Sequence, residues 1–126
     1  MNLSRRYIFI GSCILFLAVA IGAFGAHALK DIVIGKYLIT FKTGGQYHFY
    51  HGLALIFIGL LKKVSPKIEV NFVFNSFFMG ILLFSFNCYL YAITQMKIFA
   101  MIVPVGGVLF LMGWLKLAIT IYKENE

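Results

Sequence analysis

Charged side chains are scarce in this 126-residue chain, and acidic ones are the scarcest. Only 12% of the residues are charged, with four Asp or Glu against eleven Lys or Arg, whereas 62% are hydrophobic. A soluble domain of this length would have too little interior to remove so much apolar surface from water. The composition, with a mean hydropathy of +0.95, therefore indicates a membrane protein whose main partner is the lipid bilayer.

The groups that enzymes and nucleic-acid-binding proteins use are also missing. The chain has no evident nucleophile–base pair, carboxylate dyad or phosphate loop, so we expect no enzymatic activity. The net charge of +7 comes from lysines near the ends of apolar runs, which membrane headgroups explain without any nucleic acid. Cys13 and Cys88 are expected roughly 10 Å apart in depth, too far for a disulfide.

Long apolar runs dominate what is present. Each reaches or approaches the roughly 20 residues that a spanning helix needs, and none alternates as the strands of a membrane barrel do. Because lipid offers no partners for backbone amides, such runs should be helical. The sequence thus predicts an all-α membrane protein, one domain over residues 1–126, with four transmembrane helices at about 7–28, 44–61, 70–94 and 98–122.

The first run has a second interpretation. Arg5 and Arg6 precede it, and Ala26-His27-Ala28 resembles a signal-peptide cleavage site. The run is longer than the apolar part of a typical signal peptide, and three further runs follow it. We therefore interpret it as a membrane span.

The segment between the first two spans is amphipathic. Ile34, Tyr37, Leu38 and Phe41 recur at helical spacing, with polar residues on the other side. This pattern predicts an interfacial helix at about 30–43, ended by Gly44-Gly45 before the chain enters the second span.

Basic residues favour one orientation. Six lie on the side of the termini and the 62–69 loop, against four on the other side, which predicts both termini in the cytoplasm. The first group is Arg5, Arg6, Lys62, Lys63, Lys67 and Lys123, and the second is Lys30, Lys36, Lys42 and Lys97.

Small residues recur every four or seven positions in three of the spans. Such seams let helix backbones approach closely in lipid, where apolar burial does not drive association. They predict a tight bundle or an oligomer interface. The seam residues are Gly11, Ala18, Gly22, Gly45, Gly52, Gly59, Gly106 and Gly113. In the phenylalanine-rich third span, the polar residues Asn75, Ser76, Ser85 and Asn87 are expected to point inward.

The three histidines form the most suggestive polar pattern. His48 and His51 open the second span on nearly the same face, and His27 ends the first span on the same side of the membrane. The topology gathers a candidate polar cluster at one membrane level: His27, His48, His51, Gln46 and Asn87.

Four roles are open to this cluster. The cluster could be a structural hydrogen-bond cluster, the outer vestibule of a small transporter or channel, a metal site, or a pair of haem ligands. No Asp, Glu or Cys is near enough to complete a convincing metal motif, and no carboxylate continues a path across the bilayer. The structural role is favoured, with no cofactor or metal expected.

Three blocks resemble a known family. They are GAFGAHALK (22–30), TGGQYHFYHGLAL (43–55) and PVGGVLFLMGWLKLA (104–118). Together with their order, they resemble the small bacterial membrane proteins grouped as domain of unknown function 423, over about residues 11–118. The chain departs from the family pattern at Asn87-Cys88, Gln95 and Val103. The resemblance implies several membrane spans and no established activity.

The function predicted from the sequence is that of a small integral protein of the cytoplasmic membrane, structural or accessory, acting through helix packing with itself or with a membrane-protein partner. The alternatives are a small transporter or channel with a histidine-lined vestibule, and a metal- or haem-binding membrane subunit.

Overall fold

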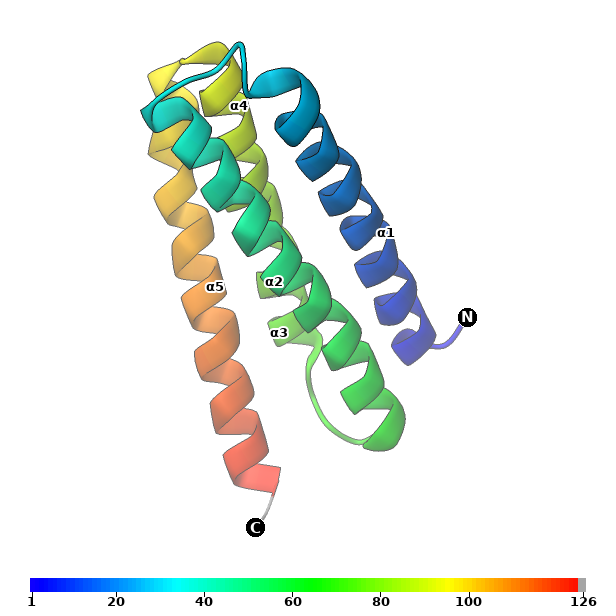
Figure 1. Ribbon diagram of the computed structural model, residues 1–126. Helices are drawn as coiled ribbons and strands as arrows, with labels where there is room; N and C mark the ends of the chain where they lie inside the picture. Colours follow the sequence, from blue (N-terminus) through cyan, green and yellow to red (C-terminus); the bar gives the residue numbers. More distant parts are fainter. Residues whose placement is uncertain (125–126) are drawn as a thin grey trace.

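Four long helical rods lie side by side and alternate in direction in the computed structural model, which describes residues 1–124 (Figure 1). The first and third rods each contain a π-helical turn, η1 and η2. In chain order the rods are α1 (Leu3–Phe24) with η1 (Gly25–Leu29); α2 (Lys36–Val64); α3 (Asn71–Gly80) with η2 (Ile81–Ser85) and α4 (Phe86–Thr94); and α5 (Lys97–Glu124). Residues 1–124 contain no strand, so the predicted all-α class is confirmed.

The connections between rods are short, so consecutive rods run antiparallel. Figure 1 places both chain termini and the 65–70 connection at one end of the bundle, here called the terminal end. The 30–35 and 95–96 connections lie at the opposite end, the loop end. Gly35, just before α2, has φ +62°, a left-handed conformation that glycine adopts without strain.

Three rods are long and apolar enough to cross a membrane, by length and composition: Leu3–Leu29, Asn71–Thr94 and Lys97–Glu124. These ranges match three of the four expected spans to within a few residues. The 29-residue α2 is equally long, but its first half carries polar residues and it is not in this set. The fold therefore directly supports one part of the prediction, a helical membrane protein with three candidate spans.

The region before the second expected span differs from the sequence-based expectation. No separate helix covers 30–43, because α2 runs unbroken from Lys36 through Gly44 and Gly45 to Val64. A Cβ added to Gly44 would lie 2.6 Å from the Cβ of Cys88 and 3.0 Å from the carbonyl oxygen of Ser85. Gly44 therefore serves the close approach of α2 to the third rod, and the turn falls at Gly35 instead.

The buried apolar side chains form two clusters along the bundle. The larger one extends from the terminal end to the middle and includes the fully buried Leu55, Ile58 and Phe77. The smaller one lies at the loop end and consists of Leu29, Val33, Phe41, Tyr89 and Ala92. Many large apolar side chains remain outside the bundle, as at Phe16 and Leu111, which are 72% and 71% exposed. Lipid contact explains such an outer surface.

The rods do not contact one another equally. The first rod packs mainly on α2, whereas α5 packs mainly on the third rod. α2 lies between these two parts and also contacts α3, η2 and α4. Polar side chains on α2 are therefore placed to join the two parts.

Candidate functional site

His48 is fully buried on α2 and joins two other rods. Its Nε2 lies 2.9 Å from the backbone oxygen of Ile14 in α1, and its Nδ1 lies 2.8 Å from the hydroxyl of Tyr89 in α4. A carbonyl oxygen only accepts, so Nε2 carries a proton and donates it to Ile14. In the neutral ring, Nδ1 accepts from the Tyr89 hydroxyl. His48 thus uses both ring nitrogens to hold α1, α2 and α4 together.

His51 is also buried on α2 but reaches α5. Its Nε2 accepts a hydrogen bond of 3.0 Å from the indole nitrogen of Trp114, which can only donate. Its Nδ1 therefore carries the proton and donates to the carbonyl oxygen of Tyr47, at 2.8 Å, one turn earlier in the same helix. The ring stacks on Phe110 of α5, with ring centres 3.5 Å apart and planes inclined by 10°.

The two rings therefore have opposite tautomers and different neighbours. His48 faces α1 and α4, whereas His51 faces α5 and contacts Phe77 of α3 edge-on. All four ring nitrogens have partners within the protein. Neither ring offers a nitrogen to a ligand shared with the other.

The other three residues of the candidate polar cluster lie elsewhere. His27 is exposed in η1 at the loop end. Gln46 is exposed and donates from Nε2 to the hydroxyl of Tyr50 at 2.7 Å. Asn87 is buried, and its hydrogen bonds go to backbone oxygens of its own rod. Within residues 1–124 the structure does not assemble the five residues into one site.

Asn87 has a local role at the π-helical turn η2. Its Nδ2 donates to the carbonyl oxygens of Leu83 at 3.0 Å and Leu82 at 3.2 Å. A π-turn shifts the backbone hydrogen-bond pattern, and a carbonyl oxygen has two lone pairs, so carbonyls at such a turn can accept a hydrogen bond from a nearby side chain. Ser85, in the same turn, is fully buried, and its Oγ has no partner in the described part of the chain.

Four polar side chains of the third rod were expected to point inward, and three do so: Ser76, Ser85 and Asn87 are buried. The expectation for Asn75 is wrong, because this side chain is exposed. It lies on a groove of about 420 Å³ between α1 and α3, together with Arg6, Tyr7 and Asn71. Tyr7 closes the inner wall of this groove by stacking on Phe74, with ring centres 3.7 Å apart.

Small residues bring α1 and α2 together over the half of their contact nearer the terminal end. A Cβ added to Gly52 would lie 2.7 Å from Cδ2 of Leu15, and one added to Gly59 would lie 2.7 Å from Cγ1 of Ile8. Gly11 offers the reciprocal contact, 2.8 Å from Cγ1 of Ile56, and Ala18 is fully buried. These seam residues are used inside the bundle and are not available to a second copy.

The seam on α5 also faces the interior. A Cβ on Gly106 would overlap the backbone of Phe84 in η2, and a Cβ on Gly113 would lie 2.6 Å from the ring of Phe77. Gly80 of α3 completes the contact, since a Cβ there would lie 2.5 Å from the ring of Phe110. Seam residues are identified in the sequence by their recurrence every four or seven positions. Gly80 was missed because α3 has no second glycine at that spacing.

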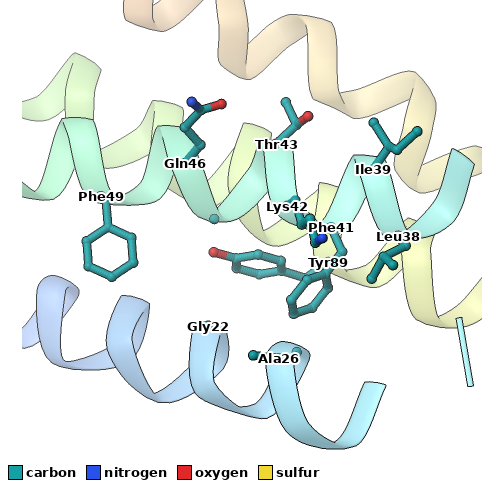
Figure 2. A pocket seen from close by; sticks show the side chains of 12 residues that line it. Gly22, Ala26, Leu38, Ile39, Phe41, Lys42, Thr43, Gln46, Phe49 and Tyr89 are labelled. Carbon is teal, nitrogen blue, oxygen red and sulfur yellow. The ribbon is translucent and has the colours of Figure 1, made fainter. Parts of the chain in front are cut away.

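Gly22 and Gly45 behave differently from the rest of the seam. A Cβ on Gly22 would lie 3.9 Å from the ring of Phe49, and one on Gly45 would lie 3.8 Å from the hydroxyl of Tyr89, both ordinary contact distances. The two glycines line a pocket of about 550 Å³ between the first rod and α2 at the loop end (Figure 2).

The described residues contain no group of three His, Cys, Asp or Glu side chains that is placed to hold a metal ion. Cys13 is exposed and Cys88 is buried, and both are free thiols. The arrangement around the histidines therefore offers hydrogen bonding between helices as its chemistry.

Sequence reasoning missed the two aromatic partners of the histidines, Tyr89 and Trp114. A tyrosine or tryptophan inside an apolar span buries its ring but still seeks a partner for its polar tip, and the nearest buried histidine is a natural one. Trp114 is the chain's one tryptophan and lies in a block that carries the family resemblance, which was a usable signal.

Comparison with known proteins identifies relatives but no activity. Residues 21–107 match the family described as "Protein of unknown function (DUF423)". A UPF0382 membrane protein of Staphylococcus saprophyticus is 42% identical over 94% of this chain and 98% of its own length. The UPF0382 membrane protein YwdK of Bacillus subtilis is 39% identical over 94% of this chain and 98% of its own length. No solved structure matches the chain significantly.

Proposed function

This chain belongs to the DUF423 family of membrane proteins, and on that premise we propose that it is a non-enzymatic structural or accessory component of the cytoplasmic membrane. It acts through helix packing, either with a second copy of itself or with a membrane-protein partner. All four rods cross the bilayer, and both termini lie on the cytoplasmic side.

One observation carries this proposal: the buried imidazoles are engaged in holding rods together. His48 connects α2 to α1 and α4, and His51 connects α2 to α5. A transport path or a metal site needs polar groups that face a common space, whereas these rings face different helices. Their arrangement supports a rigid scaffold in preference to a solute pathway.

The membrane crossing of α2 is supported by the length of its uncharged stretch and by the burial of its histidines. It has an uncharged stretch of 19 residues, Thr43–Leu61, between Lys42 and Lys62. Lys42 and Lys62 are 20 residues apart, which is about 30 Å along a helix and equals the thickness of the hydrocarbon core. Its polar His48 and His51 are turned into the bundle, away from lipid.

The orientation is supported by the arrangement of charges. The terminal end carries Arg5, Arg6, Lys62, Lys63, Lys67 and Lys123, and the loop end carries four lysines. An excess of basic residues in short loops marks the cytoplasmic side.

Cysteine labelling tests this topology. In a chain with Cys13→Ser and Cys88→Ala, single cysteines at Ile34→Cys and Lys67→Cys probe the loop end and the terminal end. Ile34 is 73% exposed in the 30–35 connection. An impermeant maleimide added to intact cells is expected to label Ile34→Cys, and to label Lys67→Cys only after permeabilisation. Labelling of both positions from outside overturns the four-span assignment.

The packing role is tested with the full chain in a gentle detergent. Affinity purification with mass spectrometry, together with light scattering for the oligomer mass, is expected to show a stoichiometric membrane partner or a defined homo-oligomer. Proteoliposomes of the same protein are expected to show no ion or solute flux above that of empty vesicles. A flux that His48→Ala abolishes while the fold is kept would instead assign the chain as a small transporter.

A further inference from the structure

The contact between the first rod and α2 is close toward the terminal end and looser beside Gly22 and Ala26, nearer the loop end. Toward the terminal end, a Cβ on Gly52 or Gly59 would meet side chains of α1 at 2.7 Å. At the loop end, a Cβ on Gly22 would find its nearest neighbour at 3.9 Å. Gly25, in the next turn of the first rod, still packs closely, because a Cβ there would overlap the ring of Phe41. The looser packing is therefore confined to the stretch beside Gly22 and Ala26, which line a pocket together with Gly45 of α2. Within residues 1–124 this stretch leaves a space between the first rod and α2.

This space is the pocket of about 550 Å³ described above, a size typical of small-molecule sites. Figure 2 shows the rings of Phe41, Phe49 and Tyr89 lying between α2 and the first rod, with Gly22 and Ala26 opposite them. Lys42, Thr43 and Gln46 of α2 also line it. The pocket is therefore mostly apolar, with one cationic side chain and a few neutral polar ones.

The lining residues change character along the membrane normal. Lys42 lies 20 residues before Lys62, so it sits at the edge of a hydrocarbon layer about 30 Å thick when Lys62 sits at the other edge. Phe49 lies seven residues deeper than Lys42, about 10 Å along the helix. The pocket thus places a cation at headgroup level and aromatic rings at acyl-chain level.

The charge around the pocket is predominantly positive. The segments that form the loop end, residues 30–46 and 93–100, contain Lys30, Lys36, Lys42 and Lys97 but a single acidic residue, Asp31. Lys36 lies over the ring of Tyr37, at 5.2 Å from its centre. Lys62, at the other end of α2, donates to the carbonyl oxygen of Ile68, and Lys42 makes no such bond within residues 1–124. Lys42 is therefore the cation available to an occupant of the pocket.

We propose that this pocket binds one glycerophospholipid with an anionic headgroup. The lipid phosphate pairs with the Lys42 ammonium, and one acyl chain lies in the pocket along Gly22 and Ala26 and against the ring of Phe49. Lipid is the occupant because the pocket has the polarity gradient of a lipid and opens on a bundle surface that lipid surrounds. The site depends on the membrane placement of the loop end and is independent of the packing role proposed above.

Lipid titration of the purified full chain, followed by native mass spectrometry from a mild detergent, tests the proposal. Dioleoylphosphatidylglycerol is compared with dioleoylphosphatidylcholine. We expect one saturable site that prefers the anionic lipid. Lys42→Gln is expected to weaken this binding about fivefold, because one lysine near an anionic lipid surface contributes about that factor. Lys63→Gln, at the exposed terminal end of the same helix, is the matched control and is expected to leave binding unchanged.

A second set of variants tests the proposal by filling the pocket. Gly22→Leu and Ala26→Leu introduce side chains into the space, and both are expected to abolish the saturable site. Ala23→Leu is the control, because Ala23 is exposed on the same helix and does not line the pocket. Circular dichroism of each variant shows whether the helices are intact, and Ala26→Leu keeps the test decisive should Gly22→Leu fail to fold.

Four outcomes overturn the proposal: equal binding of both lipids, unchanged binding in the two folded filling variants, competition by inorganic phosphate at equal concentration, or a co-purifying protein displaced by the filling variants. The first three outcomes do not bear on partner capture or flux, and the fourth would assign the pocket to the protein partner, so failure of the lipid site is distinguishable from failure of the packing role.

Discussion

His48 and His51 lie three positions apart on one helix and are similarly buried, at 0% and 3% exposure. They nevertheless hydrogen-bond to different helices. His48 donates to a backbone oxygen of α1 and accepts from a tyrosine of α4. His51 accepts from a tryptophan of α5 and donates within its own helix. One side chain connects the first rod to the third, and the other connects the second rod to the fourth.

This difference shows what a spacing of three residues means inside a bundle. Two such positions are about 60° apart around a helix, which is close on an isolated helix. α2 has neighbours on several sides, so 60° is enough to direct two rings to different rods. A pair of histidines at helical spacing therefore indicates a shared site only where a single neighbour covers both positions.

The largest effect is expected from truncating His48. His48→Ala removes two hydrogen bonds, leaves the buried Tyr89 hydroxyl unpaired and opens a cavity, so we expect a loss of about 3 kcal/mol in the free energy of unfolding. SDS titration of the helical circular dichroism signal in mixed micelles measures this loss. The control, His27→Ala, affects an exposed ring and should change stability by less than about 0.5 kcal/mol. Equal losses in the two variants would remove the distinction between a buried and an exposed histidine.

Truncating His51 is expected to cost less, about 2 kcal/mol, because its second hydrogen bond stays within α2 and Trp114 is 45% exposed. The same SDS titration measures it. The indole of Trp114 loses its acceptor, so His51→Ala should also shift the emission of the chain's one tryptophan, whereas His48→Ala should not. An equal emission change in both variants would show that the two rings belong to one network.

Removing one tyrosine hydroxyl isolates the hydrogen bond between Tyr89 and His48. Tyr89→Phe takes away only the bond to His48 and should cost about 1 kcal/mol in the same titration. Tyr50→Phe removes a hydroxyl of an exposed pair and should have no measurable effect. A Tyr89→Phe variant as stable as the parent would mean that the His48–Tyr89 bond contributes nothing to the contact between α2 and α4.

The double variant Tyr89→Phe with Trp114→Phe measures the coupling between the two histidine environments. Because the two donors bind different histidines and lie on different rods, their stability losses should add to within about 0.5 kcal/mol. A coupling energy above about 1 kcal/mol would place both bonds in one network.

The smallest expected effect is that of metal. Both nitrogens of each buried imidazole have protein partners, so zinc added at neutral pH should leave the melting temperature unchanged. Protein purified without chelator should contain no stoichiometric metal by elemental analysis. A rise of several degrees with zinc that disappears in both His48→Ala and His51→Ala would restore the shared-site interpretation.

Much of the fold was predictable because it follows from single-residue properties. The uncharged runs, their lengths and their apolar character lead directly to helices that need lipid. The error over residues 30–43 arose because Gly44-Gly45 is compatible with two physical roles. Two adjacent glycines can end a helix or let its backbone approach a neighbour, and only the presence of Cys88 and Ser85 beside Gly44 distinguishes them.

The site was less predictable. His48 lies one turn before Gly52 on α2, and both face α1: the ring donates to Ile14, and a Cβ on Gly52 would meet Leu15 and Ile14. The common membrane level of His27, His48 and His51 did not make a cluster, because equal depth says nothing about direction around the bundle. Gly22 and Gly45 obey the same spacing as Gly52 and Gly59, but they line a cavity.

By itself the sequence determined that this protein belongs in a membrane and that its apolar runs form helices, because both follow from how each residue partitions between water and lipid and from unmet backbone hydrogen bonds. Only the tertiary structure decided which rod each histidine binds, and which glycines bring backbones together or leave space. The physical reason is that helical periodicity orients a side chain on its own helix, whereas the identity of its neighbour depends on how all four rods pack at once.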